Sequence, residues 1–140
     1  MHLNPYLVFE GNCEEAFKFY EKTLGGKIKA MLTYEGSPMA KQMPEEWQKK
    51  IMHVTLEIGD QLLMGSDARG EHYHKPQGFS VSLSVKRIAE AERIFGAFEE
   101  GGQVRMPLQQ TFWAARFGMA VDRFGTPWMI NCEKEGQEGV

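Results

Sequence analysis

Hydrophobic and polar residues alternate along eight short stretches of the chain, and apolar residues recur at helical spacing in two others. Alternation predicts strands over 3–9, 27–34, 52–58 and 61–65 in the first half, and over 78–85, 103–108, 115–121 and 128–132 in the second. Helical spacing predicts helices over 13–24 and 88–100. Each predicted helix stops at a glycine pair, Gly25-Gly26 or Gly101-Gly102.

The two halves repeat one order of elements: strand, helix, glycine pair, then three strands. We therefore expect an α+β protein of a single domain with two βαβββ modules, at about 1–66 and 78–133, joined by a linker over 67–77 and followed by a polar tail over 134–140. One helix covers only one face of a four-stranded sheet. The eight strands are accordingly expected to form a curved open sheet around a cleft.

Composition and charge narrow the range of partners. The 140 residues are 42% hydrophobic and 25% charged, with a formal net charge of −3, and no basic stripe is visible, so we expect no nucleic-acid partner. No apolar run approaches the ~20 residues that cross a bilayer, and the first residues lack a signal-peptide pattern. Cys13 and Cys132 then fit reduced thiols in a cytoplasmic protein without a membrane partner.

Four separated blocks carry a family resemblance. They are Pro-Tyr-Leu-x-Phe-x-Gly-Asn-Cys-Glu-Glu-Ala at 5–16 with Phe-Tyr at 19–20, His-x-x-Leu-x-Ile-Gly-Asp at 53–60 with Leu-Met-Gly-Ser-Asp at 63–67, Phe-Trp-x-Ala-Arg-Phe-Gly at 112–118, and Asp-x-Phe-Gly-x-x-Trp-Met-Ile-Asn at 122–131. Together they resemble PhnB-like proteins of the vicinal oxygen chelate superfamily, which includes glyoxalase I, bleomycin-resistance proteins and extradiol dioxygenases. The resemblance implies the glyoxalase/bleomycin-resistance-like fold and a homodimer.

In the enzymes of that superfamily, a divalent metal is held by four residues on the first and last strands of each module. Carried onto this chain, the four positions fall at Pro5, Met64, Ser80 and Met129. None of them is His, Asp or Glu, and a thioether is a poor ligand for hard or borderline metals. We therefore expect no metal ion and no other cofactor, and a cleft that binds a small hydrophobic or aromatic molecule.

The candidate ligand-binding residues are aromatic, thioether and hydroxyl side chains near the expected cleft. They are Met64, Ser80, Ser82, Phe112, Trp113, Phe117 and Met129. Aromatic rings suit a planar small molecule, although the same rings could be ordinary core. The alternating serines suit a narrow polar cavity or, equally, a lightly exposed strand face.

His53 and Arg116 are the candidate catalytic residues. His53 shares one side of a predicted strand with Thr55, so it could act as a general base or be a hydrogen-bonded structural histidine. Arg116 could hold an anion or extend from the core to solvent. The alternative function is therefore a lyase, isomerase or dioxygenase-type enzyme of the same superfamily with a non-standard site.

Overall fold

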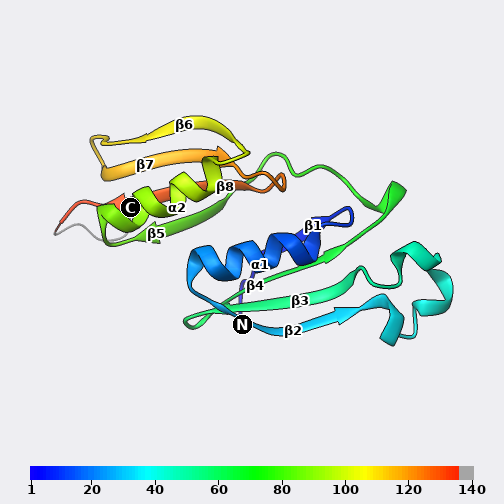
Figure 1. Cartoon of the computed structure of the whole chain (residues 1–140). Coiled ribbons are helices and arrows are strands. Elements are labelled where there is room, and N and C mark those ends of the chain that lie inside the picture. Colours follow the sequence, from blue (N-terminus) through cyan, green and yellow to red (C-terminus); the bar gives the residue numbers. More distant parts are fainter. Residues whose placement is uncertain (136–140) are drawn as a thin grey trace. The chain divides into compact units, whose positions relative to one another are not determined.

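The computed structural model of this chain describes residues 1–135, which form two compact units divided between His74 and Lys75. Each unit contains one four-stranded sheet and one long helix (Figure 1). The predicted α+β class and the order of elements in both modules are confirmed. The strands form two separate four-stranded sheets and not one continuous sheet. The cleft and the single-domain organisation stay predictions.

The first unit contains β1 (Tyr6–Phe9), α1 (Cys13–Leu24), β2 (Lys27–Thr33), β3 (Ile51–Ile58) and β4 (Gln61–Asp67). The strand order is β1-β4-β3-β2, and β1 runs parallel to β4 while the other neighbours are antiparallel. Helix α1 packs its apolar stripe against one face of this sheet. The buried side chains at that interface include Leu7, Phe9, Phe17, Tyr20, Val54 and Leu56.

The second unit repeats this plan with β5 (Val81–Val85), α2 (Ile88–Glu99), β6 (Gln103–Gln109), β7 (Ala114–Val121) and β8 (Pro127–Glu133). The strand order is β5-β8-β7-β6, again with the first strand parallel to the last. The core between α2 and the sheet includes Phe98 stacked on Trp128, with ring centroids 4.5 Å apart. First and last strands are thus neighbours in both modules.

The two long helices lie where the sequence predicts them, and the main differences concern strand ends. β1 begins at Tyr6 and not at Leu3, because the preceding Pro5 has no N–H to give to a ladder. β5 begins at Val81, after Gly78 at a φ of 79°. β4 extends to Asp67, so the predicted linker over 67–77 includes the last residue of the first sheet.

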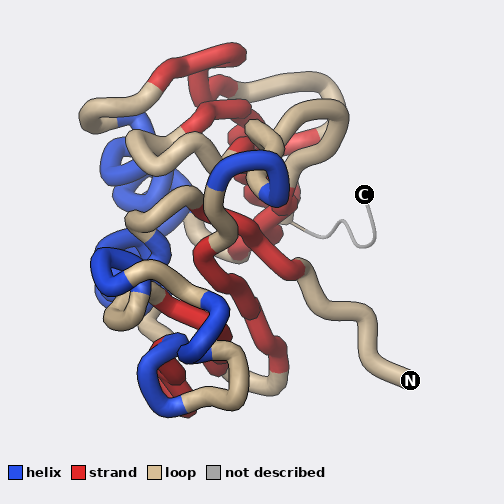
Figure 2. The backbone as a smooth tube through the Cα atoms, turned by 90° about the vertical axis from the view of Figure 1, so that its right-hand side faces the viewer, coloured by secondary structure: helices blue, strands red, loops and turns tan. Residues whose placement is uncertain are grey.

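The polar segment between β2 and β3 forms three short 3-10 turns, Tyr34–Gly36, Ala40–Gln42 and Glu45–Trp47, drawn as short helical pieces in Figure 2. None of these turns continues into an α-helix. The Gln48 side chain holds the segment together by donating to the carbonyls of Ala40 (2.7 Å) and Met43 (2.8 Å).

Candidate functional site

The face of the first sheet opposite α1 carries a short polar chain centred on His53. Tyr6 Oη lies 3.2 Å from His53 Nδ1, and His53 Nε2 lies 2.9 Å from Thr55 Oγ1. The two rings are also in contact, with centroids 5.8 Å apart. Both ring nitrogens of His53 therefore have partners on the sheet itself. Sequence reasoning did not select Tyr6, although its place between Pro5 and the buried Leu7 indicated the face that it occupies.

Strand register shows which residues of the first strands lie opposite the two methionines among the four positions carried over for a metal. Met64 is opposite Tyr6, and Met129 is opposite Ser82. Pro5 precedes β1 and Ser80 precedes β5, so neither is the residue paired with a methionine. The paired residues on neighbouring first and last strands are Tyr6 with Met64 and Ser82 with Met129, and the assignment of metal positions to Pro5 and Ser80 stays a prediction.

These residues do not fit a divalent metal ion of the kind that the superfamily enzymes hold. Two thioethers, a phenol and a serine hydroxyl supply neither an imidazole nor a carboxylate. Among residues 1–135, no three His, Cys, Asp or Glu side chains form a group that could hold a metal ion.

The corresponding face of the second sheet, opposite α2, is largely apolar and only half-buried. Met119 of β7 is opposite Met129 of β8, and both side chains are half-buried. Phe117 lies on the same face two residues before Met119, opposite Asn131. Its ring centroid is 5.4 Å from that of Trp113. Phe112 in turn contacts Trp113 at 4.9 Å, and it is 87% exposed. The three aromatic rings therefore contact one another in a row, and the register places Phe117 on the same face as Met129.

Polar groups border this apolar face along β5 and β8. Ser82 and Ser84 are exposed, and their strand partners are Met129 and Asn131. The Asn131 side chain is buried, at 6% exposure, yet neither Nδ2 nor Oδ1 has a hydrogen-bond partner in the structure. An unsatisfied buried polar group costs ~1–3 kcal/mol, so such groups call for an explanation. Sequence reasoning missed Asn131, which stands out only as a polar residue within an apolar strand.

Arg116 lies on the opposite face of β7 from Phe117. Its Nε is 3.8 Å from Glu92 Oε1 on α2, and its Nη1 donates to the carbonyl of Ala115 at 2.6 Å. The side chain is therefore engaged on the helix-covered side of the sheet. Arg116 is therefore not on the face that carries Phe117 and Met129.

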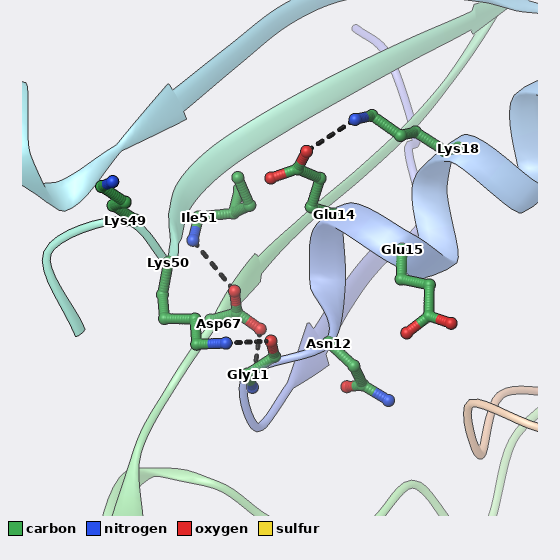
Figure 3. A pocket seen from close by; sticks show the side chains of 9 residues that line it. All are labelled: Gly11, Asn12, Glu14, Glu15, Lys18, Lys49, Lys50, Ile51 and Asp67. Carbon is green, nitrogen blue, oxygen red and sulfur yellow. Dashed lines mark hydrogen bonds and ion pairs between the residues drawn. The ribbon is translucent and has the colours of Figure 1, made fainter. Parts of the chain in front are cut away.

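The first unit also contains a pocket of about 430 Å³ at the start of α1, lined by Gly11, Asn12, Glu14, Glu15, Lys18, Lys49, Lys50, Ile51 and Asp67 (Figure 3). Asp67 is 1% exposed and accepts three backbone N–H groups, from Gly11 (2.8 Å), Cys13 (3.0 Å) and Ile51 (2.9 Å). A carboxylate engaged in this way holds the β1–α1 turn against β3, and we assign it a structural role.

The first turn of α1 is capped by a residue from a distant strand. Asn12 occupies the N-cap position, but its side chain makes no capping hydrogen bond. The carboxylate of Asp67, from the end of β4, accepts the Cys13 N–H at the first turn instead. A cap supplied from a distant strand leaves no local sequence signal.

Both cysteines are free, fully buried thiols. Burial, reinforced by the neighbouring Asp67 and Glu14 carboxylates, raises the pKa of Cys13 far above its ordinary value. Burial also raises the pKa of Cys132. Because the thiolate is the reactive form, neither cysteine is placed to act as a nucleophile.

Residues 1–131 match the model of the family described as 3-demethylubiquinone-9 3-methyltransferase. The chain belongs to this PhnB-like family. YjdN of Escherichia coli (strain K12) is 34% identical over 146 residues, which cover 96% of this chain and 97% of YjdN. The crystal structure of protein PA1353 from Pseudomonas aeruginosa is 50% identical, with a TM-score of 0.85 and coverage of 96% of this chain and 99% of PA1353.

More distant structures show the fold. The PhnB protein of Bacillus cereus is 22% identical, with a TM-score of 0.79, and covers 94% of this chain and 99% of its own. The fosfomycin resistance protein FosX of Listeria monocytogenes shares the fold at 7% identity and a TM-score of 0.64, over 96% of this chain and 94% of its own. The family resemblance and the glyoxalase/bleomycin-resistance-like fold inferred from the four sequence blocks are confirmed.

In the part of the chain that the structure describes, no helix has the length and apolar character needed to span a membrane.

Proposed function

We propose that the protein binds a small hydrophobic or aromatic molecule, without a metal ion, on the face of the second sheet opposite α2. The observation that carries this proposal is the half-buried cluster of Trp113, Phe117, Met119 and Met129. Aromatic rings offer flat contact area and thioethers adapt their shape to a ligand. Ser82 supplies a hydroxyl at the border of the same surface.

The proposed site includes most of the ligand-binding candidates that were selected from the sequence. Ser82, Trp113, Phe117 and Met129 lie on this face by register and ring contact. Phe112 extends the cluster through its contact with Trp113. Ser80 precedes β5 with the same parity as Ser82, and Met64 belongs to the first sheet, beside Tyr6.

Ligand binding is expected to shift the melting temperature and to depend on Trp113. A panel of naphthalene, indole and quinoline derivatives is screened by thermal shift, where ligand at 100 times its Kd adds ~2.7 kcal/mol of stability. Trp113→Ala should weaken each hit at least ~10-fold, as expected for loss of a buried aromatic contact. The matched control is Trp47→Phe, in the 3-10 turn Glu45–Trp47 of the first unit, which should leave the affinity unchanged.

Two further measurements test whether binding requires a metal ion or another cofactor. Binding should survive treatment with EDTA, and elemental analysis of the purified protein should find no stoichiometric Zn, Ni, Fe or Mn. S-adenosylmethionine is included because the family description names a methyl transfer. A panel without hits combined with measurable turnover, or binding that requires a metal, would contradict the proposal.

The second candidate function is an enzyme of the lyase, isomerase or dioxygenase type centred on His53. The contacts to Tyr6 Oη and Thr55 Oγ1 would fix the ring orientation and tautomer, as a general base requires. If a turnover is found, His53→Ala and Tyr6→Phe should each lower kcat/KM, the former by ~100-fold or more, as for loss of a general base. His74→Ala, at an exposed position, is the control. Unchanged turnover in His53→Ala would exclude this candidate.

We also propose that the protein works as a homodimer in the cytoplasm. The dimer follows from the resemblance to the superfamily, and the cytoplasm fits two free, buried thiols. Light scattering after size exclusion measures the oligomeric state directly.

A further inference from the structure

Asn131 is the polar side chain that the proposed function leaves unexplained. Its amide is buried without a partner, whereas the other buried polar side chains of the same unit have hydrogen-bond partners. Asp122, for example, accepts the N–H groups of Phe124 (2.9 Å) and Thr126 (3.0 Å), and the indole N–H of Trp128 (2.8 Å). In residues 1–135, no other buried side-chain nitrogen or oxygen lacks a hydrogen bond.

The position of Asn131 on β8 places it in the proposed ligand surface. Trp128 and Ile130 are fully buried toward α2, so the alternation of the strand places Asn131 on the opposite face with Met129. Across the sheet it is paired with Ser84 on β5 and with Phe117 on β7. The unsatisfied amide is thus bordered by a hydroxyl on one side and an aromatic ring on the other.

A carboxamide presents a donor and an acceptor side by side in one plane. The complementary partner is a planar group with an adjacent N–H and C=O, because the two can form a cyclic pair of hydrogen bonds. The Phe117 side chain beside the amide suits the flat ring to which such a group is attached.

We propose that Asn131 is the polar anchor of the binding site, and that it selects aromatic ligands that carry a lactam or amide edge. This inference rests on the proposed function, since it uses the same face of the sheet. It adds a ligand class: planar heterocycles with adjacent hydrogen-bond donor and acceptor, in preference to plain hydrocarbons of equal size.

The test compares two probes of similar size and shape, 2-quinolone and naphthalene, by fluorescence titration and thermal shift. The wild-type protein should bind 2-quinolone at least ~10-fold tighter than naphthalene, equivalent to ~1.4 kcal/mol. Asn131→Leu should remove this preference and raise the melting temperature of the ligand-free protein, because an unsatisfied amide is replaced by an apolar group of similar size. Asn4→Leu, at a half-buried asparagine before β1, should preserve the preference.

The possible outcomes separate the two proposals. Binding of both probes with no preference for 2-quinolone, or an equal preference in Asn131→Leu, overturns the anchoring role and leaves the proposed function standing. Absence of binding of either probe to the wild-type protein overturns both. If Asn131→Leu does not fold, Asn131→Ser gives the same comparison, since it removes the amide without adding volume.

Discussion

Replacing Asp67 by alanine is expected to destabilise the protein by ~3–5 kcal/mol, because three backbone N–H groups then lose their shared acceptor. Those donors belong to Gly11, Cys13 and Ile51, at 2.8–3.0 Å from the carboxylate, and the carboxylate itself is almost fully buried. The loss exceeds that of a typical surface mutation because water has little access to replace the acceptor. Urea denaturation followed by circular dichroism measures it.

Two further variants test whether the loss of stability comes from the hydrogen bonds of the Asp67 carboxylate. Asp67→Asn keeps the volume but leaves one oxygen, so it should lose part of the stability and fall between wild type and Asp67→Ala. Asp60→Ala removes an exposed carboxylate from the turn between β3 and β4 and should change stability by no more than ~0.5 kcal/mol. Equal effects of Asp60→Ala and Asp67→Ala would contradict the structural role assigned to Asp67.

From the sequence, Asp67 was assigned to the linker, because its burial is not predictable from the local pattern of residues. A charged residue beside Ser66 and Ala68 has the local signature of a loop. Its burial depends on backbone donors from residues 11, 13 and 51, which only the folded sheet brings together. Hydrogen bonds between a side chain and residues distant in the sequence leave no periodic pattern in the sequence.

The helices and strands themselves were predictable because their signals are local. The stripe on each helix and the glycine pair after it define α1 and α2 to within one residue. Strand ends were less certain: β1 is shorter and β4 longer than alternation indicated. Both ends depend on which neighbouring strand offers hydrogen bonds, and that is a property of the sheet.

The sheet face that each candidate residue occupies could be predicted from the sequence in part. Adjacent residues of a strand point to opposite faces, so Arg116 and Phe117 could not both line one surface. Register matters for the same reason, since moving a strand by one residue exchanges its two faces. The missing hydrogen bonds of Asn131, by contrast, could be recognised only from the structure.

Replacing the second glycine of either glycine pair by alanine is expected to cost ~2–3 kcal/mol or more, because an added Cβ would overlap backbone oxygens. At Gly102 the overlap is with the carbonyl oxygens of Val121 and Phe98, and at Gly26 with that of Glu57. A flexible side chain could move aside, but these carbonyls belong to the strand and helix that form each module. The repeated glycine pair therefore allows close backbone packing in each module and also ends the helix.

Gly96, near the C-terminal end of α2, is the matched control for Gly102→Ala. A Cβ at Gly96 would meet no atom within 4 Å, so Gly96→Ala should stabilise the helix by ~0.5–1 kcal/mol. The same substitution in the same unit is thus expected to have opposite signs at two positions six residues apart. Urea midpoints of Gly96→Ala and Gly102→Ala measure both effects. A Gly102→Ala protein as stable as wild type would show that the turn after α2 can open, and that the glycine pair serves only to end the helix.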